Sequence, residues 1–170
     1  MIYLGIDPGK QGALWMDNGR SLPNSQRFCD MPDDLADLAD EIDKMVYDAM
    51  GCQLDYLDPT DFFAVIEEPL PHVANRKAQN VAKQFTDYGR ILGTLDALGI
   101  EYQTVKAVTW QAKLLKGVFG KDTKHKALEW ARLNGADTAD FYGPRGGVKD
   151  GRVDGFCLCQ YAKSVATTKG

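Results

Sequence analysis

The sequence predicts a single α/β domain built around a mixed β-sheet. The chain has 170 residues, enough for one domain with a hydrophobic core, and 44% of them are hydrophobic, as in ordinary globular proteins. Strand-like segments alternate with amphipathic, helix-like segments along the chain, which is typical of the α/β class. No apolar run is long enough to span a bilayer, and the N-terminus lacks the pattern of a signal peptide, so we expect no membrane association.

The first three predicted strands lie close together near the N-terminus. Segment 2–6 has isoleucine or leucine at alternate positions and ends at Asp7, which a Pro-Gly pair follows. Segment 12–17 is close enough to form a hairpin with it, and segment 25–31 is predicted to be a third strand. An acid before Pro-Gly is ordinary turn chemistry, but the same turn would also deliver a carboxylate to the tip of a sheet. Asp7 is therefore either a turn residue or a site residue.

An amphipathic helix and a buried strand follow. Segment 32–51 has apolar residues at helical spacing, acids at its start and Gly51 at its end. Segment 61–68 is short and almost continuously apolar, as a central buried strand would be, and it ends in Glu67 and Glu68. Because adjacent strand residues face opposite sides, we expect one of these two glutamates to be a surface residue.

The second half of the chain is predicted to be mostly helical. Apolar stripes and glycine stops predict helices over 74–98, 108–115, 121–135 and 150–165, with a strand over 101–105 and a Gly- and Pro-rich loop over 136–149. Together these elements predict a five-stranded mixed sheet flanked by helices, in one domain that covers residues 1–170.

Charge is distributed unevenly along the chain. Residues 30–61 contain eleven acids and one lysine, a net charge of −10, so the overall charge of −4 leaves +6 on the remainder. This split predicts an acidic solvent-facing side and a basic side elsewhere. The basic residues between 106 and 132 are Lys106, Lys113, Lys116, Lys121, Lys124, Lys126 and Arg132. Any one of these is explained equally well as part of a solvated helix surface.

The cysteines and histidines do not indicate a zinc site or a disulfide framework. Cys29, Cys52, Cys157 and Cys159 show no C-x-x-C spacing, and the two histidines have no neighbours at zinc-finger spacing. We therefore expect four reduced thiols in a cytoplasmic protein.

Four acids at the ends of predicted elements suggest a metal site. If the strands at 2–6 and 61–68 are parallel neighbours, Asp7 and Glu67 or Glu68 lie at the same sheet edge. Asp150 and Asp154 are four residues apart at the start of the last helix and share a face. Mg²⁺ prefers oxygen ligands, and two such ions can clamp a phosphodiester. Asp150 could instead be only a helix cap, whereas Asp154 lies where an unpaired acid would be costly.

These acids lie in three segments that together resemble the RuvC-type Holliday junction resolvases of the RNase H-like nuclease superfamily. The segments are LGIDPG (4–9), FFAVIEE (62–68) and DGRVDGFCLCQYA (150–162), and the resemblance runs through nearly the whole chain. By this resemblance the first acid is Asp7, the second is Glu67, and Asp154 followed by a small residue is the last. The family carries two acids three residues apart in its last helix. Here Gly151 stands at the first of those positions, and the acid is displaced to Asp150.

The resemblance implies an RNase H-like fold and a Mg²⁺-dependent endonuclease that resolves four-way DNA junctions and leaves 5′-phosphate ends. It implies two Mg²⁺ ions per active site, with Mn²⁺ as a substitute, held by Asp7, Glu67, Asp150 and Asp154. It also implies a homodimer that binds branched DNA, in the cytoplasm of a bacterial cell or encoded by its phage. The family's lysines that contact phosphates near the cleaved bond fall on Lys113 and Lys124.

Further DNA contacts are predicted on both sides of the acids. Lys121 and Lys126 belong to the basic segment, while Arg76 and Lys77 begin the predicted helix 74–98, where a nearby phosphate would offset their repulsion by the helix dipole. Leu70 lies between two prolines, and it is either a stiff apolar wedge between bases or a packing contact under the helix start. The resemblance places an aromatic residue at this position.

Three other functions remain open at this point. An actin-like or sugar-kinase ATPase would share the GIDPG turn, but it needs a second, duplicated domain for which this chain is short. A non-catalytic junction-binding protein would keep the lysines but would not need the carboxylates. A nuclease of the same fold could also act on broader branched DNA or on RNA–DNA hybrids.

Overall fold

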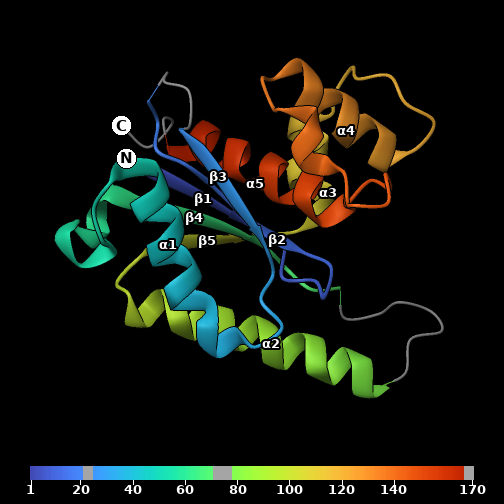
Figure 1. The fold of residues 1–170 in the computed structure, drawn as a ribbon. Helices are drawn as coiled ribbons and strands as arrows, with labels where there is room; N and C mark the ends of the chain where they lie inside the picture. Colours follow the sequence, from blue (N-terminus) through green and yellow to red (C-terminus); the bar gives the residue numbers. More distant parts are fainter. Residues whose placement is uncertain (21–24, 71–77, 167–170) are drawn as a thin grey trace.

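The computed structural model describes residues 1–20, 25–70 and 78–166, and it shows a five-stranded mixed sheet with helices on both faces (Figure 1). The strands are β1 (Ile2–Ile6), β2 (Ala13–Asp17), β3 (Gln26–Asp30), β4 (Phe62–Glu67) and β5 (Glu101–Val105). Their order across the sheet is β3-β2-β1-β4-β5. The first three strands are antiparallel neighbours, while β4 is parallel to both β1 and β5. The predicted fold class is confirmed.

The parallel pairing of β1 and β4 sets the position of two acids. Ile6 lies opposite Ile66, so the two strands end at the same edge of the sheet, as the sequence predicts. Asp7 and Glu67, which follow these two residues, therefore reach that edge side by side.

The helices divide into two groups that cover opposite faces of the sheet (Figure 1). They are α1 (Leu38–Met50), α2 (Ala78–Ala97), α3 (Ala107–Leu114), α4 (Thr123–Leu133) and α5 (Asp150–Ala166). Ile6 and Ile66 belong to the core beneath α1 and α2, whereas Val65 belongs to the core beneath α3, α4 and α5. Because strand residues alternate between faces, Asp7 and Glu67 point toward the α5 side.

Two predicted segments differ from the structure in detail. The helix predicted over 32–51 begins with a separate 3-10 turn, Leu35–Asp37, and ends at Gly51 in a left-handed conformation with φ of 74°. The loop predicted over 136–149 contains a 3-10 turn, Thr138–Phe141. Phe141 is fully buried against Trp15 and Phe156, so its burial holds this turn in the core.

Helix α5 approaches the sheet more closely than most side chains would allow. A Cβ atom on Gly5 would lie 2.1 Å from the backbone nitrogen of Cys159, and one on Gly155 would lie 2.8 Å from the Trp15 ring. The absence of side chains at these positions lets the helix rest directly on β1 and β2.

The cysteines are free thiols, as predicted. Cys157 and Cys159 point to different faces of α5, one toward the Ala127 carbonyl and the other toward the Tyr3 carbonyl. Across residues 1–20, 25–70 and 78–166, no helix has the length and apolar composition needed to cross a membrane.

Candidate active site

Three carboxylates from distant parts of the sequence meet at one edge of the sheet. Asp7 follows β1, Glu67 ends β4, and Asp154 lies in the second turn of α5. Burial raises the pKa of Asp154 to about 8, and the negative charges of Asp7, Glu67 and Asp150 add to the rise. Mutual electrostatic effects of this kind require short separations, because charges farther apart are screened. The structure thus brings together the acids that the sequence predicted as a site.

Asp7 makes the turn contact and also lies in the carboxylate cluster. Its Oδ1 accepts a hydrogen bond from the backbone N–H of Gly9 at 3.0 Å, which is the turn geometry expected for an acid before Pro-Gly. Burial nevertheless raises its pKa above the ordinary value, and the charge of Asp150 contributes to this rise. The turn therefore holds a carboxylate in an environment that disfavours its charge.

The start of α5 is held against the β1–β2 turn by backbone contact. Gly12 and Gly151 form an isolated parallel bridge, and a Cβ on Gly151 would lie 2.0 Å from the carbonyl oxygen of Gln11. No side chain fits at position 151. Position 151 therefore cannot carry an acid in this arrangement, and the nearest acid at the start of α5 is Asp150.

The adjacent glutamates Glu67 and Glu68 point to opposite faces of the sheet. The Trp110 indole N–H donates a hydrogen bond to Glu67 Oε2 at 2.7 Å from the α5 side. Glu68 accepts a hydrogen bond from the Thr104 hydroxyl at 3.0 Å. Burial raises the pKa of Tyr88 in α2, and the nearby charge of Glu68 adds to this rise, which places Glu68 on the α2 side. Both glutamates line the cavity beside Asp7, but Glu67 is the one of the two whose charge acts on Asp154.

Glu67 is held in an environment that raises its pKa to about 7. Burial is the main cause, the hydrogen bond from Trp110 opposes it, and the charge of Asp7 adds to it. Trp110 is fully buried in α3 and fixes the carboxylate in one orientation. Sequence reasoning missed this residue, because a tryptophan in a short amphipathic helix looks like a core residue and nothing more.

Asp150 is paired with Lys124 across a gap of 26 residues in the sequence. The Lys124 ammonium donates a hydrogen bond to Asp150 Oδ2, which raises the pKa of the lysine, and the charge of Asp154 adds to the rise. The backbone carbonyl of Lys149 accepts the first helical hydrogen bonds of α5, so Asp150 is its first residue rather than its cap. Asp150 therefore lies in the site with one predicted DNA-contacting lysine beside it.

The other predicted basic contacts lie at different distances from the carboxylates. The Lys113 ammonium lies over the ring of Tyr161, 5.1 Å from its centroid. Tyr161 is seven residues beyond Asp154 in α5, or about 10 Å along the helix axis. Lys121 and Lys126 flank the start of α4 and are at least partly exposed. Arg76 and Lys77 lie outside the described residues.

A further residue that sequence reasoning missed is Arg152, which lies between the two acids of α5. Its Nε and Nη2 donate hydrogen bonds to the two carboxylate oxygens of Asp30 at 2.6 and 2.9 Å, and its Nη1 donates to the Asp140 carbonyl at 2.9 Å. The guanidinium also stands 4.7 Å from the centroid of the Phe28 ring. A cation in the first turn of a helix opposes the helix dipole, and Asp30 offsets that cost. This contact fixes the start of α5 to β3.

Leu70 lies next to the carboxylates. Its side chain is 53% exposed, and with Pro69 it lines a cavity of about 190 Å³ whose walls also include Asp7, Glu67, Glu68 and Gln84. The position beside Asp7 and Glu67 agrees with the predicted wedge. The alternative contact with the start of helix 74–98 involves residues 71–77, which lie outside the described part.

The donor set fits a divalent metal by its chemistry and charge. Asp7, Glu67, Asp150 and Asp154 offer only oxygen ligands, which Mg²⁺ and Mn²⁺ prefer. Burial and mutual repulsion raise the pKa values of Asp7, Glu67 and Asp154, and a bound cation would relieve that repulsion. Within the described residues, no three acidic, histidine or cysteine side chains are already arranged as a metal cage.

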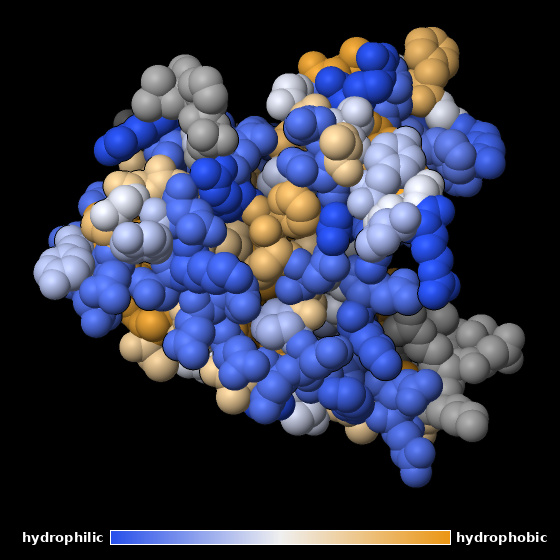
Figure 2. Space-filling model, in the orientation of Figure 1, coloured by the Kyte–Doolittle hydropathy of each residue, from blue (hydrophilic) through white to orange (hydrophobic). Residues whose placement is uncertain are grey.

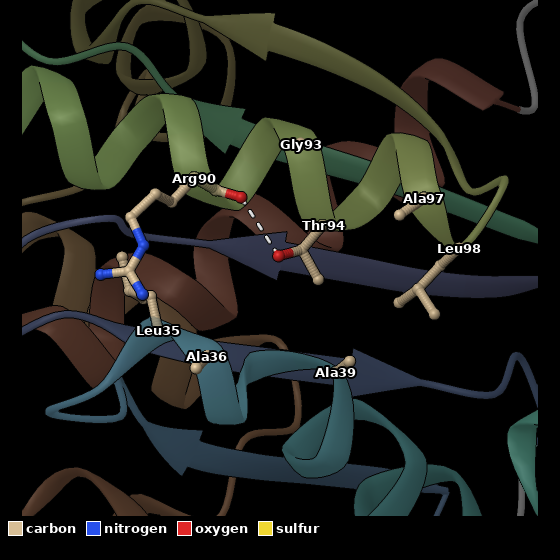
Figure 3. A pocket seen from close by; sticks show the side chains of 8 residues that line it. All are labelled: Leu35, Ala36, Ala39, Arg90, Gly93, Thr94, Ala97 and Leu98. Atoms are coloured by element: carbon tan, nitrogen blue, oxygen red, sulfur yellow. Dashed lines mark hydrogen bonds between the residues drawn. The ribbon is translucent and has the colours of Figure 1, made fainter.

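A separate groove on the opposite face carries no comparable chemistry. It has a volume of about 420 Å³ and runs between the start of α1 and the C-terminal half of α2 (Figure 3). Apolar and small residues form most of its walls, and its one charged lining residue, Arg90, is paired with Asp34. The Thr94 hydroxyl in its wall donates to the Arg90 carbonyl at 3.1 Å (Figure 3). The candidate active site is therefore the sheet edge.

Comparison with known proteins adds information on the fold. The sequence matches no protein-family model and no curated protein. Two solved structures align over 99% of the chain: Thermus thermophilus RuvC, with a TM-score of 0.52, 16% identity and 97% of that chain covered; and T. thermophilus RuvC in complex with Holliday junction substrate, with a TM-score of 0.56, 13% identity and 96% of that chain covered. The chain therefore shares the RuvC-like α/β fold over nearly its whole length.

Proposed function

We propose that the protein is a Mg²⁺-dependent, structure-selective DNA endonuclease that resolves four-way junctions. The observation that carries this proposal is the meeting of Asp7, Glu67 and Asp154 at one sheet edge, next to the Lys124–Asp150 pair. Metal-dependent phosphodiester hydrolysis requires a cluster of carboxylates that can hold the metal ions, and a neighbouring lysine can contact the phosphate. The likeness of the whole fold to a RuvC solved with a Holliday junction supports four-way DNA as the substrate.

Each residue of the site has a proposed role. Asp7, Glu67, Asp150 and Asp154 would hold two Mg²⁺ ions, or Mn²⁺ in their place, and the ions would supply Lewis-acid chemistry for phosphodiester hydrolysis. Trp110 keeps the Glu67 carboxylate in one orientation, and Arg152 holds the helix that carries the two aspartates. Water is added across the P–O3′ bond, so the 3′ oxygen leaves and the products carry 5′-phosphates.

DNA is held mainly through its backbone. Lys113 and Lys124 contact phosphates near the cleaved bond, and Lys121, Lys126, Arg76 and Lys77 make further contacts to the DNA backbone. Lysine contacts to phosphates position the duplex without reading its sequence. Selectivity then comes from the shape of the junction.

We expect Lys124→Ala to lower the cleavage rate more than the affinity for junction DNA. Lys124 lies beside Asp150, where it can reach a phosphate at the reacting centre, and the loss of one phosphate contact should reduce the salt slope of binding by about one unit. Cleavage rates and binding at several salt concentrations measure both effects.

Two other lysines complete this experiment. Lys113→Ala should have a smaller effect, because Lys113 lies over Tyr161, and Lys44→Ala in the acidic helix α1 should have none. Unchanged cleavage by both the Lys124 and Lys113 variants would mean that the two lysines are solvated surface residues.

Leu70→Ala tests the apolar wedge. If Leu70 inserts between bases, the variant keeps its melting temperature, loses cleavage of intact junctions and partly regains it on junctions with unpaired bases at the crossover. If Leu70 only packs under the following helix, the melting temperature falls and the activity per folded molecule is unchanged. That second pattern would exclude the wedge.

We further propose that each copy is one nuclease domain, that two copies form a symmetric dimer, and that the protein acts in the cytoplasm. A four-way junction presents two equivalent strands for cleavage, and a two-fold dimer offers two sites related in the same way. Light scattering of the purified protein should give twice the chain mass. A monomer that nevertheless cuts both strands at once would contradict the dimer.

A further inference from the structure

The connection between α3 and α4 presents an exposed aromatic side chain that the proposed mechanism does not use. Phe119 in this connection is 92% exposed, the highest value among the large hydrophobic side chains of the described residues. The connection, gold in Figure 1, projects from the edge of the molecule, and hydrophobic atoms appear at the end of this projection in Figure 2. Such a position keeps the ring away from the protein's own core.

The backbone around Phe119 is anchored on both sides. The Val118 N–H donates to the Leu115 carbonyl at 3.2 Å, and Gly117 takes a left-handed conformation with φ of 79°. Beyond the ring, Gly120 packs so closely on α4 that a Cβ there would lie 2.8 Å from the Lys126 backbone nitrogen. Asp122 then caps α4 by accepting the His125 N–H at 2.9 Å. Phe119 is therefore held outward by a tied loop.

The sequence around this ring is rich in lysine. Lys116, Lys121, Lys124 and Lys126 lie within seven residues of it, and the single acid between them, Asp122, is engaged with His125. An apolar ring among cations matches the two parts of a nucleotide, a base with a flat apolar face and a phosphate. An apolar or acidic protein surface would match only one of these features.

The α3–α4 connection is joined to the carboxylate cluster through Lys124. Lys124 pairs with Asp150, and Phe119 precedes Lys124 by five residues, so the chain between their Cα atoms spans at most about 17 Å. Leu70, in contrast, approaches the site from the end of β4.

We propose that Phe119 stacks on an unpaired base of the DNA that is bound at the active site. The inference rests on the proposed nuclease function and adds a second base contact, separate from the predicted wedge at Leu70. Stacking on an aromatic side chain tolerates any base, so the contact favours substrates with opened base pairs over intact duplex.

Binding without cleavage tests the proposal. A fluorescein-labelled four-way junction and a labelled single-stranded oligonucleotide are titrated in EDTA with the wild type, Phe119→Ala and Phe119→Trp. Phe119→Ala should bind both DNAs about fivefold to a hundredfold more weakly, whereas Phe119→Trp should bind like the wild type. Tyr56→Ala is the matched control, since Tyr56 is 78% exposed in the acidic segment, and it should bind like the wild type.

Tryptophan fluorescence gives a readout that does not depend on activity. The emission gained in Phe119→Trp should be quenched when DNA saturates the protein, whereas the emission gained in Tyr56→Trp should not change. The stacking contact would be overturned if Phe119→Ala bound DNA as tightly as the wild type, or if the emission gained in Phe119→Trp were not quenched by DNA. It would also be overturned if Phe119→Ala changed the molar mass of the protein in solution and left its DNA affinity unchanged. If the wild type itself binds neither DNA, the proposed function fails, and this inference fails with it.

Discussion

Asp154→Asn is expected to reduce junction cleavage by more than about 100-fold, as much as Asp7→Asn does, because even partners of metal ligands cost 10- to 100-fold when they are lost. Asp154 interacts electrostatically with each of the other three acids, since the charges of Asp7, Glu67 and Asp150 all raise its pKa. The loss of this carboxylate removes an oxygen ligand from the centre of the proposed metal site. Initial cleavage rates at saturating Mg²⁺ measure the effect.

Two controls separate this loss from misfolding. The melting temperature of Asp154→Asn should equal or exceed that of the wild type, because burial disfavours the charge that the substitution removes. Asp150→Asn should lose less activity, since Asp150 is more exposed and its partner Lys124 remains able to reach DNA. Cleavage by Asp154→Asn at the wild-type rate would rule out the two-metal site.

Glu67→Gln is expected to abolish cleavage while junction binding is kept, and Glu68→Gln is expected to stay active. The amide oxygen introduced by Glu67→Gln can still accept the Trp110 N–H, so the substitution removes charge without removing the contact that orients the side chain. Glu68 lines the same cavity as Asp7, but its carboxylate is turned toward Thr104 and α2, and Glu67 is the glutamate of this pair whose charge raises the pKa of Asp154. Cleavage and binding assays on the two variants provide a matched comparison of adjacent residues.

The reverse pattern would show that the sheet presents Glu68 to the DNA instead. A loss of binding in Glu67→Gln would place Glu67 in substrate contact rather than in metal binding. A third result, full activity in both variants, would remove β4 from the active site.

The sequence predicted the candidate site residues whose positions follow from short-range patterns along the chain. Alternation along 2–6 and 61–68 placed acids at strand ends, and parallel pairing in a mixed sheet brought Asp7 beside Glu67. The helical period placed Asp150 and Asp154 together on the last helix. These predictions needed only side-chain periodicity and the order of elements, except that the choice of Glu67 over Glu68 came from the resemblance to the RuvC-type family.

The contacts that sequence reasoning missed join residues far apart in the chain. Trp110 and Glu67 are 43 positions apart, and Arg152 and Asp30 are 122 apart. Each residue also has an ordinary local explanation, a core tryptophan or a solvated arginine, so no local pattern singled it out. The bridge between Gly12 and Gly151 is of the same kind, because backbone contact between distant glycines leaves no periodic signal.

The most direct test of the account is a cleavage assay with Mg²⁺ on four substrates side by side: a four-way junction, a fork, a linear duplex and an RNA–DNA hybrid, with Asp154→Asn as the inactive control. We predict that the wild type cuts the four-way junction fastest, leaves 5′-phosphate ends, and requires the divalent metal. Preferred cleavage of the fork or the hybrid would indicate a broader nuclease of the same fold. Junction binding without cleavage of any substrate would contradict the central claim that the carboxylate cluster is catalytic.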